Sequence, residues 1–317
     1  MEHLLASLRA AAEPTRLRLL ALAGRGSFCV MEFTEILGQS QPRLSRHLKL
    51  LCDCGLLDRL REGANVWFTL PGGEDGALVR DLIARLPPED PTLESDRRQA
   101  VRVLAERERI ASESFRVKGA DWDEMRALDL PARAVEDALM ALGAHGDRLL
   151  DIGTGTGRVL ELLAPRFRQA LGVDASKQML ALARARLAKR ELGNCTVRLA
   201  DMYRLPLADA SFDTAVLQMV LHYAEDPPGA IAEAARVLSP GGHLIVIDLA
   251  AHTRTDMTAK RAHRWPGFSD AAINRFLTGA GLNDSGAVTI PGPLDVRIWS
   301  ATRPQSAVRD VSLEQVA

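Results

Sequence analysis

A glycine-rich stretch at residues 148–157, "RLLDIGTGTG", has the composition of a cofactor-binding loop. An apolar run ends at Asp151, and Gly153, Gly155 and Gly157 then alternate with threonines. Glycines let a ligand lie against the backbone, and a helix that begins there offers free N–H groups to a carboxylate. The G-x-G-x-G spacing differs from the G-x-G-x-x-G of dinucleotide-binding loops.

Two further acids end the next two apolar runs. Asp174 ends the run in "ALGVDAS", and Asp201 with Met202 ends the run in "VRLADMY". A carboxylate at the position of Asp174 can accept hydrogen bonds from both hydroxyls of a ribose. At the position of Asp201, an aspartate can accept from an adenine amino group while the Met202 N–H donates to a ring nitrogen. With Asp151, these acids would line one crevice, where open α/β sheets bind ligands.

Residues 40–61 have the side chains of a DNA-reading element. A helix in the major groove needs short polar and basic side chains near its N-terminus. The stretch supplies Gln41, Arg43, Ser45, Arg46 and Lys49, and a following hairpin supplies Arg59 and Arg61 for phosphates. Five basic residues face two acidic ones here, a local excess of +3. The alternative is a helix with a solvated polar face.

The elements that position this stretch follow a winged helix-turn-helix plan. Helices are expected at 2–12, 14–24 and 30–37, the last ended by Gly38. Pro42 falls in the first turn of the polar helix, and Gly55 ends it. Two strands around "EGAN" follow, then a loop at 71–76, a helix at 77–86 and a linker at 87–91. Residues 93–118 read as a charged helix, either solvated or passing strain between domains or protomers.

From residue 131 the pattern alternates strand and helix, which predicts a parallel sheet with helices on both faces. The last two strands have no helix between them and should pair antiparallel at the sheet edge. The expected strands lie near 148–152, 169–173, 195–199, 213–218, 243–248, 284–290 and 294–301, and the helices near 131–142, 157–164, 176–191, 227–238 and 269–280. The expected domains are 1–86, a connection at 87–130, 131–302 and a flexible tail at 303–317.

Composition limits the function classes. The 317 residues carry a net charge of −1, so any nucleic-acid contact must come from a local patch. Four cysteines are too few for a disulfide scaffold. The N-terminus is a poor signal peptide, and no uncharged apolar run reaches membrane-spanning length. We expect a reduced, cytoplasmic protein that makes no membrane contact.

The first quarter of the chain resembles the ArsR/SmtB family of bacterial repressors, over about residues 1–75. The resemblance rests on "AEPTRLRLLALAG", "QPRLSRHLKLL" and "GLLDRLREGANVWFTL". It implies a homodimer on an inverted-repeat operator, released by an effector, with Gln41, Ser45 and Arg46 at the DNA.

Many members of that family bind metals or arsenicals through a Cys-x-Cys pair in the third helix. Here Cys29 matches the first thiolate, but Met31 stands where the second should be. A thioether is a poor substitute for a thiolate. Cys52 and Cys54 do not make a closed site by themselves. We therefore expect no metal site, and a metal-responsive repressor remains an alternative.

Residues 131–302 resemble class I S-adenosylmethionine-dependent methyltransferases, the ubiquinone-biosynthesis-like subgroup in particular. The resemblance rests on "LDIGTGTG", "GVDAS", "LADMYRLPLADASFD", "LHYAEDP" and "ARVLSPGGHLIVIDL". It implies a Rossmann-like α/β fold with a seven-stranded sheet whose last strand is antiparallel. It also implies a site for S-adenosylmethionine or S-adenosylhomocysteine at Asp151, Gly153, Gly155, Gly157, Asp174, Ala175, Met179, Asp201, Met202 and Gln218.

Two functions remain open for this site. Methyl transfer needs alignment and sometimes a base, and His222 and Tyr223 are the catalytic candidates. Asp248, His252 and His263 read as polar rim residues. A catalyst does not need an operator, whereas a sensor needs both halves of the chain. We therefore expect an ArsR-type transcriptional repressor with the adenosyl nucleotide as effector, and an active methyltransferase with a fused DNA-binding module as the alternative.

Overall fold

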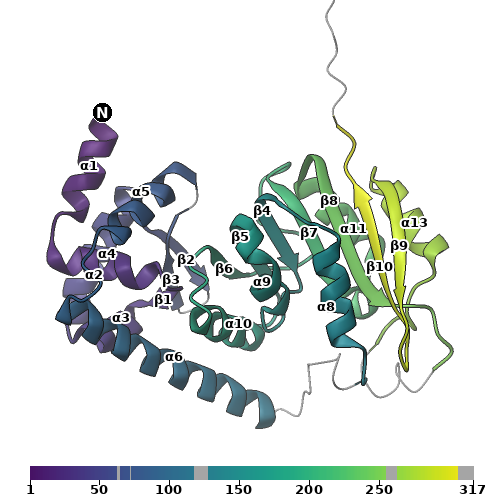
Figure 1. The fold of residues 1–317 in the computed structure, drawn as a ribbon, viewed down its shortest axis with the longest axis horizontal. Coiled ribbons are helices and arrows are strands. Elements are labelled where there is room, and N and C mark those ends of the chain that lie inside the picture. Colours follow the sequence, from purple (N-terminus) through teal and green to yellow (C-terminus); the bar gives the residue numbers. More distant parts are fainter. Residues whose placement is uncertain (63–64, 72, 118–127, 255–262, 306–317) are drawn as a thin grey trace, which may run out of the picture.

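A computed structural model describes residues 1–62, 65–71, 73–117, 128–254 and 263–305. Figure 1 shows a helical N-terminal part beside a twisted sheet flanked by helices. The fold class is the expected one, a helix-turn-helix region followed by a Rossmann-like α/β domain. No helix in the described ranges is long and apolar enough to cross a membrane.

The N-terminal part contains the expected winged helix-turn-helix elements. They are α1 (Glu2–Ala11), α2 (Pro14–Ala23), β1 (Phe28–Cys29), α3 (Val30–Leu37), α4 (Gln41–Asp53), β2 (Asp58–Glu62), β3 (Asn65–Thr69) and α5 (Gly73–Ala84). Gly38 ends α3 with φ 64°, a conformation that suits glycine. The apolar face of α4 is buried at Leu44, Leu48 and Leu51, as its spacing predicts. The three strands pair in the order β1-β3-β2.

One boundary in this part was predicted wrongly. Helix α5 begins at Gly73, although residues 71–76 were expected to form a loop and the helix to begin at 77. Glycine is a poor helix former, so the two glycines at 72–73 favoured the prediction of a loop. Acidic residue types directly after it favour a first helical turn, and that preference prevails here.

The long helix α6 (Pro91–Val117) is packed along one side, so the solvated interpretation is wrong for that face. Ala100, Val103 and Leu104 are buried in the core of the N-terminal part. Asp96, also buried, accepts two hydrogen bonds from Arg18 at 2.6 and 2.7 Å. Because α6 also packs on a helix of the second half, it connects the two parts of the chain.

The second half is a seven-stranded sheet with the order β6-β5-β4-β7-β8-β10-β9. Its strands are β4 (Gly146–Ile152), β5 (Phe167–Asp174), β6 (Cys195–Leu199), β7 (Phe212–Gln218), β8 (Leu238–Leu249), β9 (Asn283–Ile290) and β10 (Val296–Thr302). Strands β4 to β8 run parallel, and β10 pairs antiparallel with both β8 and β9. The predicted antiparallel pair at the sheet edge is therefore confirmed.

Helices cover both faces of this sheet, as expected for the alternating pattern (Figure 1). One buried apolar cluster joins the sheet to α8 (Ala132–Ala141), α9 (Arg158–Leu163) and α10 (Lys177–Lys189). A second cluster joins its other face to α11 (Pro227–Val237) and α13 (Asp270–Gly279). Strand order reverses between β4 and β7, and a crevice forms at such a switch point.

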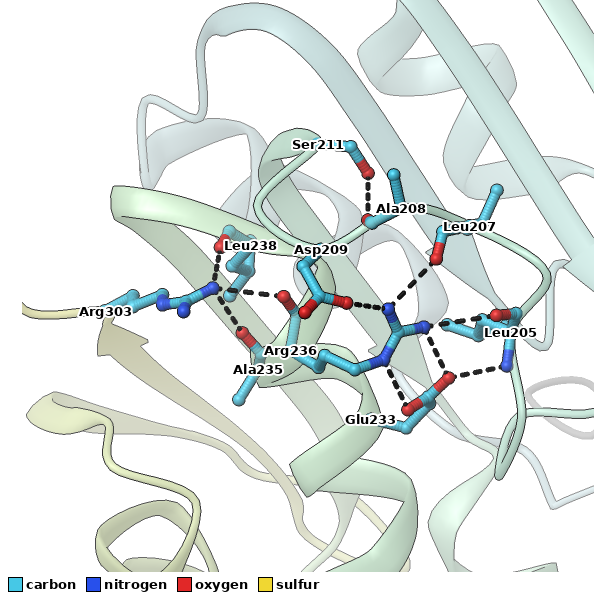
Figure 2. A network of polar contacts seen from close by, with 10 residues as sticks. All are labelled: Leu205, Leu207, Ala208, Asp209, Ser211, Glu233, Ala235, Arg236, Leu238 and Arg303. Carbon is cyan, nitrogen blue, oxygen red and sulfur yellow. Dashed lines mark hydrogen bonds and ion pairs between the residues drawn. The ribbon is translucent and has the colours of Figure 1, made fainter.

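Strand β10 is followed by an anchored arginine. Figure 2 shows Arg303 donating hydrogen bonds to the carbonyl groups of Ala235, Arg236 and Leu238, at the end of α11. The backbone of Arg303 also exchanges hydrogen bonds with Gly241 and Gly242. The segment predicted as a flexible tail from 303 thus starts with a fixed residue, and residues 306–317 lie outside the described part.

Candidate functional site

A large cavity opens where β4, β5, β6 and β7 end, with a volume of about 1370 Å³. Eight of the ten predicted cofactor residues lie in its wall: Gly153, Gly155, Asp174, Ala175, Met179, Asp201, Met202 and Gln218. They come from four different strand ends and from the first turn of α10. The fold thus brings the sequence-predicted residues to one place, while Asp151 and Gly157 lie behind the wall.

The glycine loop requires glycine because of its backbone conformation and its close contacts. Gly153, Gly155 and Gly157 all have positive φ, at 74°, 52° and 79°. A Cβ atom on Gly153 would lie 2.6 Å from a methyl group of Val220. A Cβ atom on Gly157 would lie 3.1 Å from the Cβ of Ala183 in α10. The loop therefore presents bare backbone to the cavity and packs directly on α10 behind it.

Asp151 is a buried acid with an unused oxygen. Its Oδ2 accepts a hydrogen bond from the Thr154 hydroxyl at 2.6 Å. Its Oδ1 is buried and has no hydrogen-bond partner within the described residues. Burial raises the pKa of Asp151 from 3.8 to about 7, and the nearby Asp174 carboxylate adds to the rise. Asp151 therefore stays largely protonated below about pH 7 in the folded protein.

Asp174 joins the glycine loop to α10. Its Oδ2 accepts from the Gly155 N–H at 2.9 Å, and its Oδ1 accepts from the Ser176 N–H at 2.7 Å. Burial raises the pKa of Asp174, against the effect of these backbone donors. The Ser176 hydroxyl in turn caps α10 by accepting from the Met179 N–H. Any ligand that bonds to the Asp174 carboxylate therefore touches both the loop and the start of α10.

The loop that follows Asp201 and Met202 is held by Arg236, whose contacts with Leu205 and Leu207 are drawn in Figure 2. The Arg236 guanidinium donates to the carbonyl groups of Leu205 and Leu207 at 3.1 and 3.0 Å. It also bonds to both oxygens of Glu233 at 2.7 and 2.9 Å, and Glu233 accepts from the Leu205 N–H. This network holds the loop after Met202 against α11.

The catalytic candidates after β7 lie differently from what was expected. Tyr223 lies in the cavity wall, but His222 is fully buried, and its Nδ1 lies 2.7 Å from Asp248 Oδ1. Asp248 and His263 are buried as well, so their interpretation as rim residues is wrong. Asp248 also accepts from the N–H groups of Leu221 and His222. The pair thus fixes the chain after β7 to β8.

Several wall residues were missed by the sequence analysis. Tyr203 and Arg264 lie in the wall, and Arg264 forms an ion pair with Glu225 at 2.7 Å. Arg264 lies 15 positions after Leu249, where the last recognised motif ends, and belongs to no motif, so no spacing signal could reveal it. Met219 has φ 54°, an uncommon conformation for a non-glycine residue at a cavity. Its position directly after β7 was the only available signal.

The DNA-reading candidates divide between α4 and the hairpin. Gln41, Arg43, Arg46 and Lys49 are exposed on α4, and Ser45 is half-buried. Arg59 and Arg61 are exposed on β2. Arg59 also lies in the wall of a second cavity of about 460 Å³, between the hairpin and the β5–β6 edge of the sheet.

The four cysteines, Cys29, Cys52, Cys54 and Cys195, are free thiols. Cys29 is the N-cap residue of α3, and burial raises the pKa of its thiol. Burial also raises the pKa of Cys52, to about 11. Within the described residues, no three His, Cys, Asp or Glu side chains come together as a metal-binding group.

Two family models match this chain. Residues 13–59 match the bacterial regulatory protein, arsR family, and residues 150–246 match the methyltransferase domain. The chain joins an ArsR-family helix-turn-helix to a class I methyltransferase domain. The first match contains α4, and the second contains the glycine loop and the four cavity strands β4 to β7 apart from the start of β4.

Relatives of this chain include an uncharacterized 37.1 kDa protein in transposon TN4556 of Streptomyces fradiae, 37% identical over 56% of this chain and 55% of the relative. A malonyl-(acyl-carrier protein) O-methyltransferase of Serratia marcescens is 33% identical over 45% of this chain and 53% of its own length. The chain thus spans about half the length of these relatives.

A solved structure shares the fold of the methyltransferase domain. It is the N-methyltransferase NodS from Bradyrhizobium japonicum WM9 in complex with S-adenosylhomocysteine. The TM-score is 0.50 at 25% sequence identity, and the match covers 62% of this chain and 99% of that structure.

Proposed function

We propose that this chain is a DNA-binding transcriptional repressor whose methyltransferase domain binds S-adenosylhomocysteine or S-adenosylmethionine as its effector. One observation carries the proposal: the wall of the nucleotide cavity and the DNA-reading part share a buried contact through α10 and α6. A tethered catalyst would not need that contact, whereas a sensor does. By linkage, an effector that prefers one conformation shifts the affinity for DNA.

The residues around the cavity fit an adenosyl nucleotide. Asp174 would accept from the ribose hydroxyls, and Asp201 with the Met202 N–H would bind the adenine. The bare backbone of Gly153 and Gly155 leaves room for the amino-acid part, with Gln218 near its ammonium group. Asp151 lies behind this wall, so its Oδ1 would bind the ammonium group only after the glycine loop moves. Ala175 and Met179 would pack on the nucleoside.

The ArsR-type part would bind an inverted-repeat operator as a homodimer. Its exposed α4 residues would reach base edges, and Arg59 and Arg61 would bind phosphates. A dimer is supported by α1, where Leu4, Leu5 and Leu8 are exposed on the helix surface. An apolar stripe of this kind marks an interaction surface. Such a repressor would work in the cytoplasm.

The test uses Asp174→Ala in the full-length chain. We expect this variant to lose its response to S-adenosylhomocysteine while it keeps the DNA affinity of the nucleotide-free protein. Asp137→Ala, an exposed change on α8, serves as the matched control and should respond normally. Binding of a labelled duplex with and without nucleotide gives the readout. An intact response in Asp174→Ala would disprove the assignment of the cavity.

The size of the cavity favours a second candidate, an active methyltransferase. Drug-sized ligands occupy cavities of roughly 300–1,000 Å³, so about 1370 Å³ leaves space for an acceptor next to the nucleotide. Bound S-adenosylmethionine would supply an activated methyl group, and Tyr223 at the wall could orient an acceptor. Incubation with methyl-labelled S-adenosylmethionine and small-molecule, DNA or protein acceptors tests it. Sustained product formation would favour the enzyme, and tight binding without turnover would favour the sensor.

A further inference from the structure

We propose that a buried stack of Arg184 on Trp67 transmits occupancy of the nucleotide cavity to the DNA-binding wing. The inference rests on the proposed sensor function and names its route. Arg184 lies in α10 of the methyltransferase domain, and Trp67 lies in β3 of the wing hairpin. The guanidinium carbon lies 4.1 Å from the centre of the indole, well within the range of a cation–π contact.

The first step of the route runs from the cavity to α10. The glycine loop touches α10 on both sides of Arg184 in sequence. Gly157 packs against Ala183, and the Thr156 hydroxyl accepts a hydrogen bond from Arg186 at 2.8 Å. Gly153, Gly155 and Thr156 all line the cavity, so a ligand that moves this loop also moves the middle of α10.

The same helix is held at its N-terminus by Asp174, through Ser176. Ribose hydroxyls would donate to the oxygens that now accept from Gly155 and Ser176. Nucleotide binding therefore acts on α10 at its first turn and again beside Arg184. A packed helix passes such a displacement along its axis, because its interior cannot be compressed.

The second step crosses between the domains. Arg184 and Trp67 are both buried, at 5% and 8% exposure, so the stack is shielded from solvent and salt. Arg184 is also fixed to its own sheet by a hydrogen bond from its Nη2 to the Val197 carbonyl. The indole N–H of Trp67 has no hydrogen-bond partner among the described residues. Ring contacts and packing therefore hold Trp67 in place.

The third step distributes the movement within the winged helix. Trp67 pairs with Leu60 of β2 on one side and with Cys29 on the other. A second guanidinium, that of Arg107 in α6, lies 5.0 Å from the centre of the Trp67 indole. Arg107 in turn bonds to Glu32 at 2.8 Å, and Glu32 accepts from the Cys29 N–H where α3 begins.

Both DNA-contacting elements therefore depend on the position of Trp67. Strand β2 carries Arg59 and Arg61 next to Leu60, and α3 directly precedes the reading helix α4. A shift of Arg184 would tilt the wing and the α3–α4 pair together. That combination changes the fit to both the phosphates and the groove, which is what an effector must achieve.

The experiment compares full-length Arg184→Met, Arg184→Lys, Trp67→Leu and the Arg184→Met/Trp67→Leu double variant with the wild type. Arg184→Lys keeps the charge and removes the planar group that stacks. Arg25→Met is the matched control, because Arg25 also crosses the domain boundary, to Glu191, but through an exposed ion pair. The DNA probe is the tightest duplex that nucleotide-free wild type selects from a random pool. Its affinity is measured with and without S-adenosylhomocysteine, and nucleotide affinity is measured by calorimetry.

We expect the wild type and Arg25→Met to change DNA affinity by about 5- to 150-fold on nucleotide binding. The Arg184 and Trp67 variants should bind nucleotide normally but respond by less than about 2-fold, and the double variant should respond no less than the single ones. If Arg184→Met does not fold, the responses of Arg184→Lys and Trp67→Leu test the route instead. Wild-type responses in the folded variants would overturn the route alone. A wild type that binds no nucleotide, or binds it without any change in DNA affinity, would overturn the proposed function itself.

Discussion

Replacing Asp151 with asparagine should stabilise the nucleotide-free protein and weaken its nucleotide binding. The reason is the position of the acid, fully buried with one unused oxygen. Burial raises its pKa from 3.8 to about 7. The Asp151 carboxyl therefore ionises less readily in the folded state than in the unfolded one, and it stays protonated up to a higher pH.

The sign of the pH dependence follows directly. An acid whose pKa is raised on folding destabilises the folded state as the pH rises from its unfolded pKa to its folded pKa. With 3.8 and about 7 as these values, the cost is about 2 kcal/mol at about pH 5 and about 4 kcal/mol at about pH 8. Between about pH 5 and about pH 8, the free energy of unfolding of the wild type should therefore fall by about 2 to 3 kcal/mol relative to that of Asp151→Asn. Above about pH 7 the difference should stop growing.

The assay is chemical unfolding of wild type, Asp151→Asn and the exposed control Asp147→Asn at both pH values. The stability gap between Asp151→Asn and the wild type should widen with pH, and Asp147→Asn should follow the wild type. Saturating S-adenosylhomocysteine should stabilise the wild type more than Asp151→Asn, since the ammonium group of the nucleotide would pair with the Asp151 carboxylate. A gap that is the same at both pH values would refute the assigned burial and pKa.

Three further changes test other parts of the account. Arg46→Ala removes an exposed side chain of α4 and should weaken duplex binding by about tenfold or more in a gel-shift titration, while calorimetry shows unchanged nucleotide affinity. Arg236→Met cuts the network under the Asp201 loop and should weaken S-adenosylhomocysteine binding by about tenfold, or ~1.4 kcal/mol, and normal affinity would contradict that role. Leu8→Glu places a charge in the apolar stripe of α1 and should convert a dimer to a monomer in sedimentation, whereas an unchanged mass would exclude α1 from the interface.

The strands, the glycine loop and the acids at the strand ends could be predicted because each is encoded locally. Asp174 and Asp201 end apolar runs, and parallel strands bring their carboxyl ends to one edge without further information. The apolar spacing of Leu44, Leu48 and Leu51 likewise fixes which side of α4 is buried.

Contacts between distant residues could not be predicted in this way. His222 looked like a catalytic candidate and Asp248 like a rim residue, but the two form a buried pair between the segment after β7 and the end of β8. Arg236 and Arg184 are ordinary helical arginines in sequence, and only packing shows that one fastens a loop and the other stacks on Trp67. Helix α6 looked solvated because its buried positions, such as Val103 and Leu104, are few and lie among charges.

The most direct test of the central claim is the affinity of the full-length chain for a labelled duplex, measured by fluorescence anisotropy with and without saturating S-adenosylhomocysteine. We expect the dissociation constant of the duplex to change by at least about fivefold when the cavity is filled. Equal dissociation constants in the two conditions, with calorimetry showing that the nucleotide is bound, would contradict it.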